Sequence, residues 1–369
     1  MRFFAALAVV VTHVELLKDQ FLCENVWRSN KLVFEAGPLG VVFFFVLSGF
    51  LITFLLLKEK SVSGTIAVKK FYIRRILRIW PLYYFIILLG FLVLPKISFI
   101  NIEYLARFFD TNFAPNFLLY LLFLPNLAFS IYAAVPHIGQ TWSIGVEEQF
   151  YIIWPLIVKY SRNVLIALIA MISVLIAMKA IMLLIYAQHP TNHILKSIKT
   201  FLAMTKMESM AIGGIGAWIL FNYPEKLKAM FNNFILVIAI ILIPVFVYVA
   251  PPVIQDAMYL VYSVLFLVII LNVSSNKHSF IKLENKAFVV LGNISYGMYM
   301  YHLIVVAFVI KGLLYLGYPV NNSFFPQLVL YTIVIALTIG VSWLSYNFFE
   351  VRFLKLKEKF TVVKSGSRL

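Results

Sequence analysis

Charged residues are scarce in this sequence. Only 12% of its 369 residues are Asp, Glu, Lys or Arg, and 63% are hydrophobic, whereas a soluble globular domain carries about 25% charged and 45–50% apolar residues. This scarcity excludes an ordinary soluble domain. The short alternating segments of a closed barrel are also missing, and the chain offers instead about ten apolar stretches of roughly 20 residues, the length that one helical crossing of a bilayer requires.

Cysteine is nearly absent, since Cys23 is the only one. It therefore excludes an internal disulfide, and we interpret it as a small apolar residue. No small-residue cleavage pattern follows the first apolar segment, so no cleavable signal peptide is expected. Because internal repeats and Gly/Ser linkers are missing too, we expect one membrane domain over 1–350 and a basic cytoplasmic tail over 351–369.

The predicted fold class is all-α, a polytopic transmembrane helix bundle of about ten spans. The expected spans are 3–22, 39–57, 79–95, 143–158, 164–187, 206–221, 232–250, 257–273, 291–311 and 327–348. A shorter apolar run at 117–129 is too brief to cross a bilayer and is interpreted as an interfacial or re-entrant piece.

The net charge of +16 comes from basic residues whose distribution along the chain fits a membrane topology. With the N-terminus inside, the cytoplasmic loops and tail hold 21 of the 31 Lys and Arg residues, nine lie outside, and Lys179 lies within a span. The positive-inside rule therefore places both termini in the cytoplasm, and nucleic acid is not an expected partner. Loop 188–206, with Lys196, Lys199 and Lys206, is the exception to this charge distribution.

An ionisable residue inside a span is costly and defaults to a functional or paired role. His13 follows Arg2 by eleven residues, about three helical turns or ~16 Å, so the two side chains share a face. His13 would lie near the middle of the bilayer, where a neutral imidazole can act as a general base. The alternative, a packing histidine bonded to another helix, stands equally open. Glu15, two positions on, is expected to point away from His13.

Two further segments contain candidate residues. Arg75 and Arg78 lie three apart and could grip phosphate together, although a topogenic anchor is the simpler interpretation of these arginines alone. Ser143 and Glu147 lie four apart at the start of an apolar run, where they could orient a sugar or the histidine. The adjacent Glu148 adds a second carboxylate, more than a helix start requires.

Two weaker patterns complete the set. Small residues before and within the stretch 43–50 predict close approach between helices. Tyr299 and His302, three apart in the ninth expected span, could line a cavity in a supporting role.

Together these elements resemble acyltransferase family 3, integral-membrane O-acyltransferases that acetylate bacterial polysaccharides and other sugars. The resemblance covers nearly the whole chain. It rests on Arg2-x10-His13, Phe43 to Phe50, Arg75-x-x-Arg78, Trp142-Ser143 to Tyr151, and Ser295-Tyr296 to His302. Family members usually carry several residues before the signature arginine, whereas only Met1 precedes it here.

The resemblance implies transfer of an acyl group from acyl-CoA to a carbohydrate hydroxyl, in the bacterial inner (cytoplasmic) membrane. His13 would be the catalytic base, with Ser143 and Glu147 beside it. The resemblance also implies that Arg75 and Arg78 engage the acyl-CoA. Arg2 and Trp142 are expected to join them, and Glu148, Tyr299 and His302 are expected to support the site. Acetyl-CoA is the implied donor, succinyl or longer chains stay open, and no metal is expected. Lipopolysaccharide, exopolysaccharide, peptidoglycan and small glycosides all remain candidate acceptors, and the oligomeric state and the route of the acyl group are open.

Two other functions are alternatives to acyl transfer. A proton-coupled multi-pass transporter of a sugar-related or anionic solute would also carry a midplane histidine with carboxylates, although matching broken helices are not evident. A non-catalytic flippase or assembly partner in a polysaccharide pathway would tolerate the loss of His13.

Overall fold

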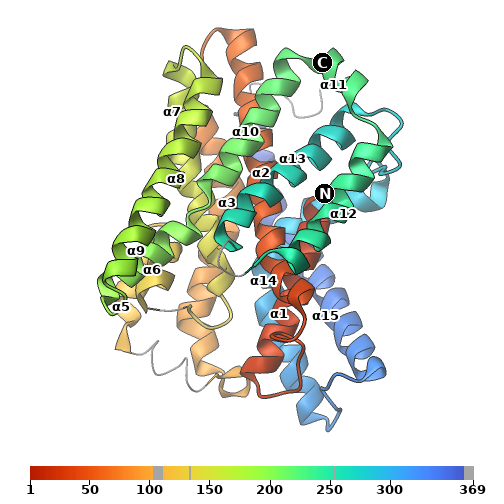
Figure 1. Ribbon diagram of the computed structural model, residues 1–369. Helices are drawn as coiled ribbons and strands as arrows, with labels where there is room; N and C mark the ends of the chain where they lie inside the picture. Colours follow the sequence, from red (N-terminus) through yellow and green to blue (C-terminus); the bar gives the residue numbers. More distant parts are fainter. Residues whose placement is uncertain (103–110, 133, 252–254, 361–369) are drawn as a thin grey trace. The chain divides into compact units, whose positions relative to one another are not determined.

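The computed structural model describes residues 1–102, 111–132, 134–251 and 255–360 (Figure 1). Helices occupy all ten predicted spans. The N-terminal half contains α1 (Arg2–Gln20), α2 (Lys31–Ser63), α3 (Val68–Leu88), α5 (Phe113–Leu121), α6 (Pro125–Tyr132), α7 (Trp142–Tyr160) and α8 (Val164–Gln188). The remaining helices are α9 (His193–Met204), α10 (Met207–Asn222), α11 (Pro224–Met230), α12 (Asn233–Val249), α13 (Gln255–Ser275), α14 (Lys286–Tyr315), α15 (Phe324–Ser345) and α16 (Val351–Glu358).

Six helices in the described residues are long and apolar enough to cross a membrane, and a seventh is added if the bent pair α11–α12 is one span. The chain is thus a polytopic helical membrane protein, which confirms the predicted fold class. The predicted spans 3–22, 143–158 and 206–221 form α1, α7 and α10. This count omits them because α1 and α7 carry several charged residues and α10 has only 16 residues.

The apolar run 117–129 forms parts of two short helices. Helices α5 and α6 have 9 and 8 residues, and the chain between them turns at Phe123, whose φ is +58°. A helix of eight or nine residues rises only about 12–14 Å, less than half of the hydrocarbon thickness. This run therefore does not cross the bilayer as one continuous helix.

The described residues divide into two compact units, each assembled from separate parts of the chain. The first unit comprises Met1–Val41, Arg75–Gly145 and Glu284–Leu356. The second unit comprises Val42–Arg74, Val146–Leu283 and, within the described chain, residues 357–360. Helices α2, α3 and α7 each contribute residues to both units. The predicted tail 351–369 contributes α16, while Lys364 and Arg368 lie outside the described residues.

In the first unit, α14 packs against both α1 and α15. The N-terminal part of α2 also contacts α1, and Gly40 makes that approach close. A methyl group on Gly40 would lie 2.7 Å from the carbonyl oxygen of Ala5 and 2.9 Å from Val9. Only glycine fits there, which fixes α1 against this part of α2.

The second unit has a closer helix contact. A Cβ on Gly49 of α2 would overlap the carbonyl oxygen of Met210 of α10, and one on Gly213 would overlap that of Val46. The reciprocal glycines let the two backbones touch, as in other membrane helix pairs with small residues at the contact. The close helix approach predicted for the stretch 43–50 is therefore confirmed.

Helix α8 has a different environment from α2. Only 11% of the residues in its most apolar stretch are buried, against 78% in α2. Such a largely apolar and uncovered helix is suited to direct contact with lipid chains. Its N-terminus is capped by Asn163, whose side chain accepts hydrogen bonds from the backbone N–H groups of Leu165 and Ile166.

Candidate active site

His13 lies in the middle of α1 and is partly buried, so its ring keeps some accessible surface. Its Nδ1 lies 2.9 Å from the carbonyl oxygen of Val9, one turn earlier in the helix. A carbonyl oxygen can only accept a hydrogen bond, so Nδ1 of His13 carries the proton and donates. In the neutral imidazole, the other nitrogen, Nε2, then holds a lone pair.

His302 of α14 contacts His13 and is fully buried. Its Nδ1 lies 2.8 Å from the carbonyl oxygen of Tyr299 and must likewise be protonated and donate. Nε2 of neutral His302 is therefore an acceptor, and it lies 3.1 Å from Nδ1 of His13. The N–H of His13 is thus shared between Val9 and His302, and the two rings have their centroids 4.9 Å apart.

These hydrogen bonds fix which nitrogen of His13 is basic. The Tyr299 carbonyl sets the tautomer of His302, and His302 together with the Val9 carbonyl sets the tautomer of His13. In the part of the chain that the structure describes, Nε2 of His13 forms no hydrogen bond. The sequence predicted a supporting role for Tyr299 and His302, and the structure places His302 against His13 and Tyr299 against His302.

Tyr299 also links this pair to the start of α7. Its hydroxyl donates to the carbonyl oxygen of Gln140 at 3.0 Å and lies 2.7 Å from Oγ of Ser143. All three residues are buried. Ser143, predicted as a site residue, therefore reaches the histidine pair through Tyr299, at one end of a hydrogen-bonded chain within the first unit.

Gln140 was not assigned a role from the sequence. Its Nε2 donates to the carbonyl oxygen of Met300 at 2.8 Å, while its buried Oε1 has no hydrogen-bond partner in the described residues. Such an unsatisfied acceptor is uncommon and is one place where a substrate group can donate a hydrogen bond. The only sequence signal was its position, three residues before Ser143.

Glu147 has partners within the second unit. It accepts hydrogen bonds from the hydroxyl of Ser48 at 2.8 Å and from that of Tyr151 at 3.1 Å. Ser48 lies in the stretch 43–50, whose sequence predicts only close packing between helices, so this contact was missed. Ser143 and Glu147 do lie four apart on α7, as predicted, but their described partners belong to different units. The adjacent Glu148 is buried.

The arginine candidates lie on helices as expected. Arg2 begins α1, the same unbroken helix that carries His13, and is partly buried. Arg75 and Arg78 share a face of α3, and the charge of Arg78 interacts with Glu350, in the π-helical segment Tyr346–Glu350. The carboxylate of Glu350 was not anticipated, and it partly offsets the positive charge there.

Trp142 is the first residue of α7 and is partly buried. Its assigned role toward acyl-CoA remains a prediction, as do those of the arginines. Within the described ranges, no group of three or more His, Cys, Asp or Glu residues lies close enough together to hold a metal ion.

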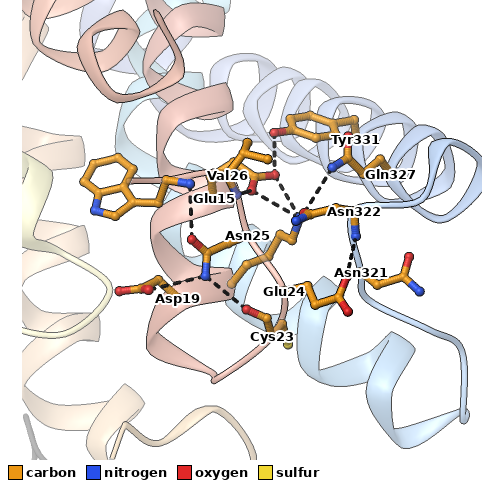
Figure 2. A network of polar contacts seen from close by, with 12 residues as sticks. Glu15, Asp19, Cys23, Glu24, Asn25, Val26, Asn321, Asn322, Gln327 and Tyr331 are labelled. Carbon is orange, nitrogen blue, oxygen red and sulfur yellow. Dashed lines mark hydrogen bonds and ion pairs between the residues drawn. The ribbon is translucent and has the colours of Figure 1, made fainter. Parts of the chain in front are cut away.

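A second polar cluster surrounds the C-terminal end of α1 (Figure 2). Glu15 accepts hydrogen bonds from Lys18, from the Val26 backbone N–H at 2.8 Å and from the Tyr331 hydroxyl at 2.9 Å. Lys18 also donates to Asn322 at 3.1 Å, and both charged side chains are fully buried. Glu15, expected only to point away from His13, is therefore the centre of a satisfied ion-pair network that joins α1 to α15.

Comparison with known proteins identifies the family. The profile of acyltransferase family 3, described as "Acyltransferase domain", matches residues 1–347. The chain is 29% identical to the "Putative O-acetyltransferase SACOL0978" of Staphylococcus aureus (strain COL), over 89% of this chain and 55% of that protein.

Two shorter matches carry more specific names. The chain is 33% identical to the "Peptidoglycan O-acetyltransferase OatA" of Listeria monocytogenes, over 33% of this chain and 20% of that protein. It is 28% identical to the "Putative peptidoglycan O-acetyltransferase YrhL" of Bacillus subtilis, over 50% of this chain and 27% of that protein.

The chain spans about half the length of the curated relatives that it matches most extensively. No solved structure matches it. The family profile nevertheless covers most of the chain, from Met1 through nearly all of the described helices. The matched range includes His13, His302 and every other residue predicted for the site. The chain belongs to acyltransferase family 3.

Proposed function

We propose that this chain is a membrane O-acyltransferase that moves an acyl group, acetyl by family, from acyl-CoA to a carbohydrate hydroxyl. His13 is the general base. The observation that carries the proposal is the hydrogen-bond chain from Tyr299 through His302 to His13, which leaves the lone pair of His13 on Nε2. A base with a fixed tautomer and an unoccupied basic nitrogen is what proton abstraction from an alcohol requires.

The reaction follows from that arrangement. Nε2 of His13 takes the proton as the sugar oxygen attacks the thioester carbonyl carbon. A C–O bond forms, the C–S bond then breaks, and the departing CoA thiolate takes the proton back from His13. While His13 is cationic, its Nδ1–H still donates to Val9 and His302, two neutral acceptors that stabilise the charge.

The remaining assignments divide between acceptor and donor. Polar groups for the sugar come from Gln140, Ser143 and Glu147. The buried Oε1 of Gln140 has no hydrogen-bond partner in the described residues, so it can accept a hydrogen bond from a sugar hydroxyl. Arg2, Arg75, Arg78 and Trp142 engage the CoA moiety, because forked guanidinium donors suit its phosphates. The names of two relatives make a peptidoglycan hydroxyl one candidate acceptor.

The decisive test is His13→Ala, followed by mass spectrometry of the cell's glycans with and without the gene. We expect the variant to reach the membrane in normal amounts and acylation to fall by about 10²- to 10⁴-fold, the usual contribution of a general base. His13→Gln, which keeps a polar side chain but cannot take a proton, should fall equally. Normal acylation in either variant would contradict the proposal.

We further propose that the protein lies in the bacterial cytoplasmic membrane with both termini inside, residues 1–350 forming the acyltransferase domain and 351–369 a basic tail. In a Cys23→Ser background, we expect Ser29→Cys to react with a membrane-impermeant maleimide on intact spheroplasts. Ser61→Cys should react only after permeabilisation, since the loop after α2 is cytoplasmic. Both positions are exposed. Labelling in the reverse order would invert the topology.

A further inference from the structure

A pocket of about 260 Å³ lies in the second unit, lined by residues of α8, α9, α10 and α13 and of the loop before α10. None of the residues assigned to acyl transfer lines it. Most of its wall is apolar and includes Met182, Leu183, Leu202 and Leu260. The volume is just below the range of about 300–1,000 Å³ typical of small-molecule sites, so it suits a head group better than a whole lipid.

A buried carboxylate in this pocket has an unused oxygen. Glu208 is 4% exposed, and one of its oxygens is bonded to the ammonium group of Lys179 on α8. The other oxygen, Oε2, is buried without a hydrogen-bond partner in the described residues. Because a buried acceptor of this kind is costly to leave unpaired, the pocket is prepared for a ligand that donates a hydrogen bond to Glu208.

Two more lysines give the pocket an excess of positive charge. The ammonium group of Lys199 lies 4.1 Å from the ring centroid of Tyr186, and that of Lys206 lies 3.8 Å from that of Tyr259. With Lys179, these lysines supply three positive charges to the lining, and Glu208 and the exposed Asp256 supply two negative ones. The net charge of +1 matches a head group with a single negative charge.

The surroundings of the pocket point to lipid. Helix α8 is largely uncovered, and the amphipathic α9 has no fully buried residue. An apolar ligand chain could therefore leave the pocket along these helices and lie among the bilayer lipids. Lys199 and Lys206 also belong to the loop that departs from the positive-inside distribution, and a ligand-binding role gives a reason for their placement.

We propose that this pocket binds an amphiphile whose head group combines one phosphodiester charge with a hydroxyl. The phosphate lies against Lys199 and Lys206, the hydroxyl donates to Oε2 of Glu208, and the chain follows Leu183 and Leu202. This site goes beyond the proposed acyl transfer, because binding requires neither His13 nor a CoA thioester.

Native mass spectrometry of the full chain in detergent, with added phosphatidylglycerol, tests the proposal. We expect Lys199→Gln and Lys206→Gln each to weaken binding by roughly 10-fold, the loss of one charge-assisted contact. Lys196→Gln is the matched control, because Lys196 is an exposed lysine of α9 that does not line the pocket. Equal binding by Lys196→Gln and Lys199→Gln variants would overturn the proposal, provided that both give the wild-type unfolding temperature. If Lys199→Gln unfolds, Lys206→Gln carries the same comparison.

Three other ligands test each part of the head group. Phosphatidylmethanol has the same charge but no hydroxyl, so it should bind about 10-fold more weakly than phosphatidylglycerol if Glu208 accepts that hydrogen bond. Diacylglycerol, which lacks the phosphate, should bind weakest. Equal binding of phosphatidylglycerol, phosphatidylmethanol and diacylglycerol would overturn the assignment. Displacement of phosphatidylglycerol by inorganic phosphate, the third added ligand, would also overturn it. Loss of acylation in the His13→Ala variant with unchanged lipid binding would separate this site from the proposed reaction.

Discussion

Helix α1 carries two buried polar centres that differ in one physical respect. At its C-terminal end, Glu15 and Lys18 form a charged network in which both carboxylate oxygens accept hydrogen bonds. In its middle, His13 belongs to an uncharged chain that ends on a nitrogen without a partner in the described residues. A fully satisfied network holds a helix in place, whereas a partly satisfied one leaves a group available for chemistry.

The first prediction tests the structural side of this comparison. Lys18→Met leaves the carboxylate of Glu15 buried without its countercharge, so we expect the protein to lose about 3–5 kcal/mol of stability. Thermal unfolding in detergent measures the loss. The double variant Glu15→Gln, Lys18→Met should recover much of it, because no uncompensated charge is left.

Lys228→Met is the matched control for that variant. Lys228 pairs with Glu225 at the same three-residue spacing, but both side chains are exposed, 45% and 80% respectively. Removing an exposed pair of this kind should cost less than about 0.5 kcal/mol. Similar losses for Lys18→Met and Lys228→Met would mean that the network in Figure 2 does not hold α1.

The second prediction concerns His302, whose proposed role is to position His13. His302→Leu removes one of the two acceptors for Nδ1–H of His13 and leaves only the Val9 carbonyl, so the orientation of the ring is less restricted. We expect kcat to fall by about 10- to 100-fold, comparable to the loss of a second-layer hydrogen bond at a metal-bound histidine. The His13 variants, in contrast, should lose nearly all activity.

A conservative variant separates positioning from packing. The amide oxygen of Gln at position 302 can still accept the hydrogen bond from His13, so His302→Gln should restore much of kcat and keep the wild-type pH profile. A packing role would give equal activity to the Leu and Gln variants, and that result would contradict the tautomer argument.

Much of the fold could be predicted because long apolar stretches determine membrane helices almost alone. All ten predicted spans became helices, and Gly49 and Gly213 confirmed close approach where small residues gather. The charges on α1 and α7 made a count of spans ambiguous, because charged side chains lower the apolarity on which such a count depends.

For the candidate site, the sequence indicated residues but not the contacts between them. Spacing along one helix joined Tyr299 to His302, but nothing local could pair His302 with His13, which is 289 residues away. The contact of Ser48 with Glu147 was missed for the same reason, since the sequence separation is 99 residues. Such contacts arise from packing between helices, which periodicity within one helix does not encode.

The smallest expected effect concerns His137, a histidine that lies outside both polar centres of α1. His137 lies in the loop before α7, buried, with its Nε2–H donating to the carbonyl oxygen of Ile100 at 3.0 Å. Burial disfavours the charged imidazolium and lowers the pKa of His137 to about 4. Between that value and the ordinary pKa near 6.5, the unfolded chain binds a proton that the folded protein does not bind, so stability falls as the pH falls.

From pH 7 to pH 6 the loss of stability should be about 1 kcal/mol or less. His137→Gln should flatten this dependence in thermal unfolding while leaving acylation at pH 7 unchanged, and an unaltered acid sensitivity would show that folding does not lower the pKa of His137.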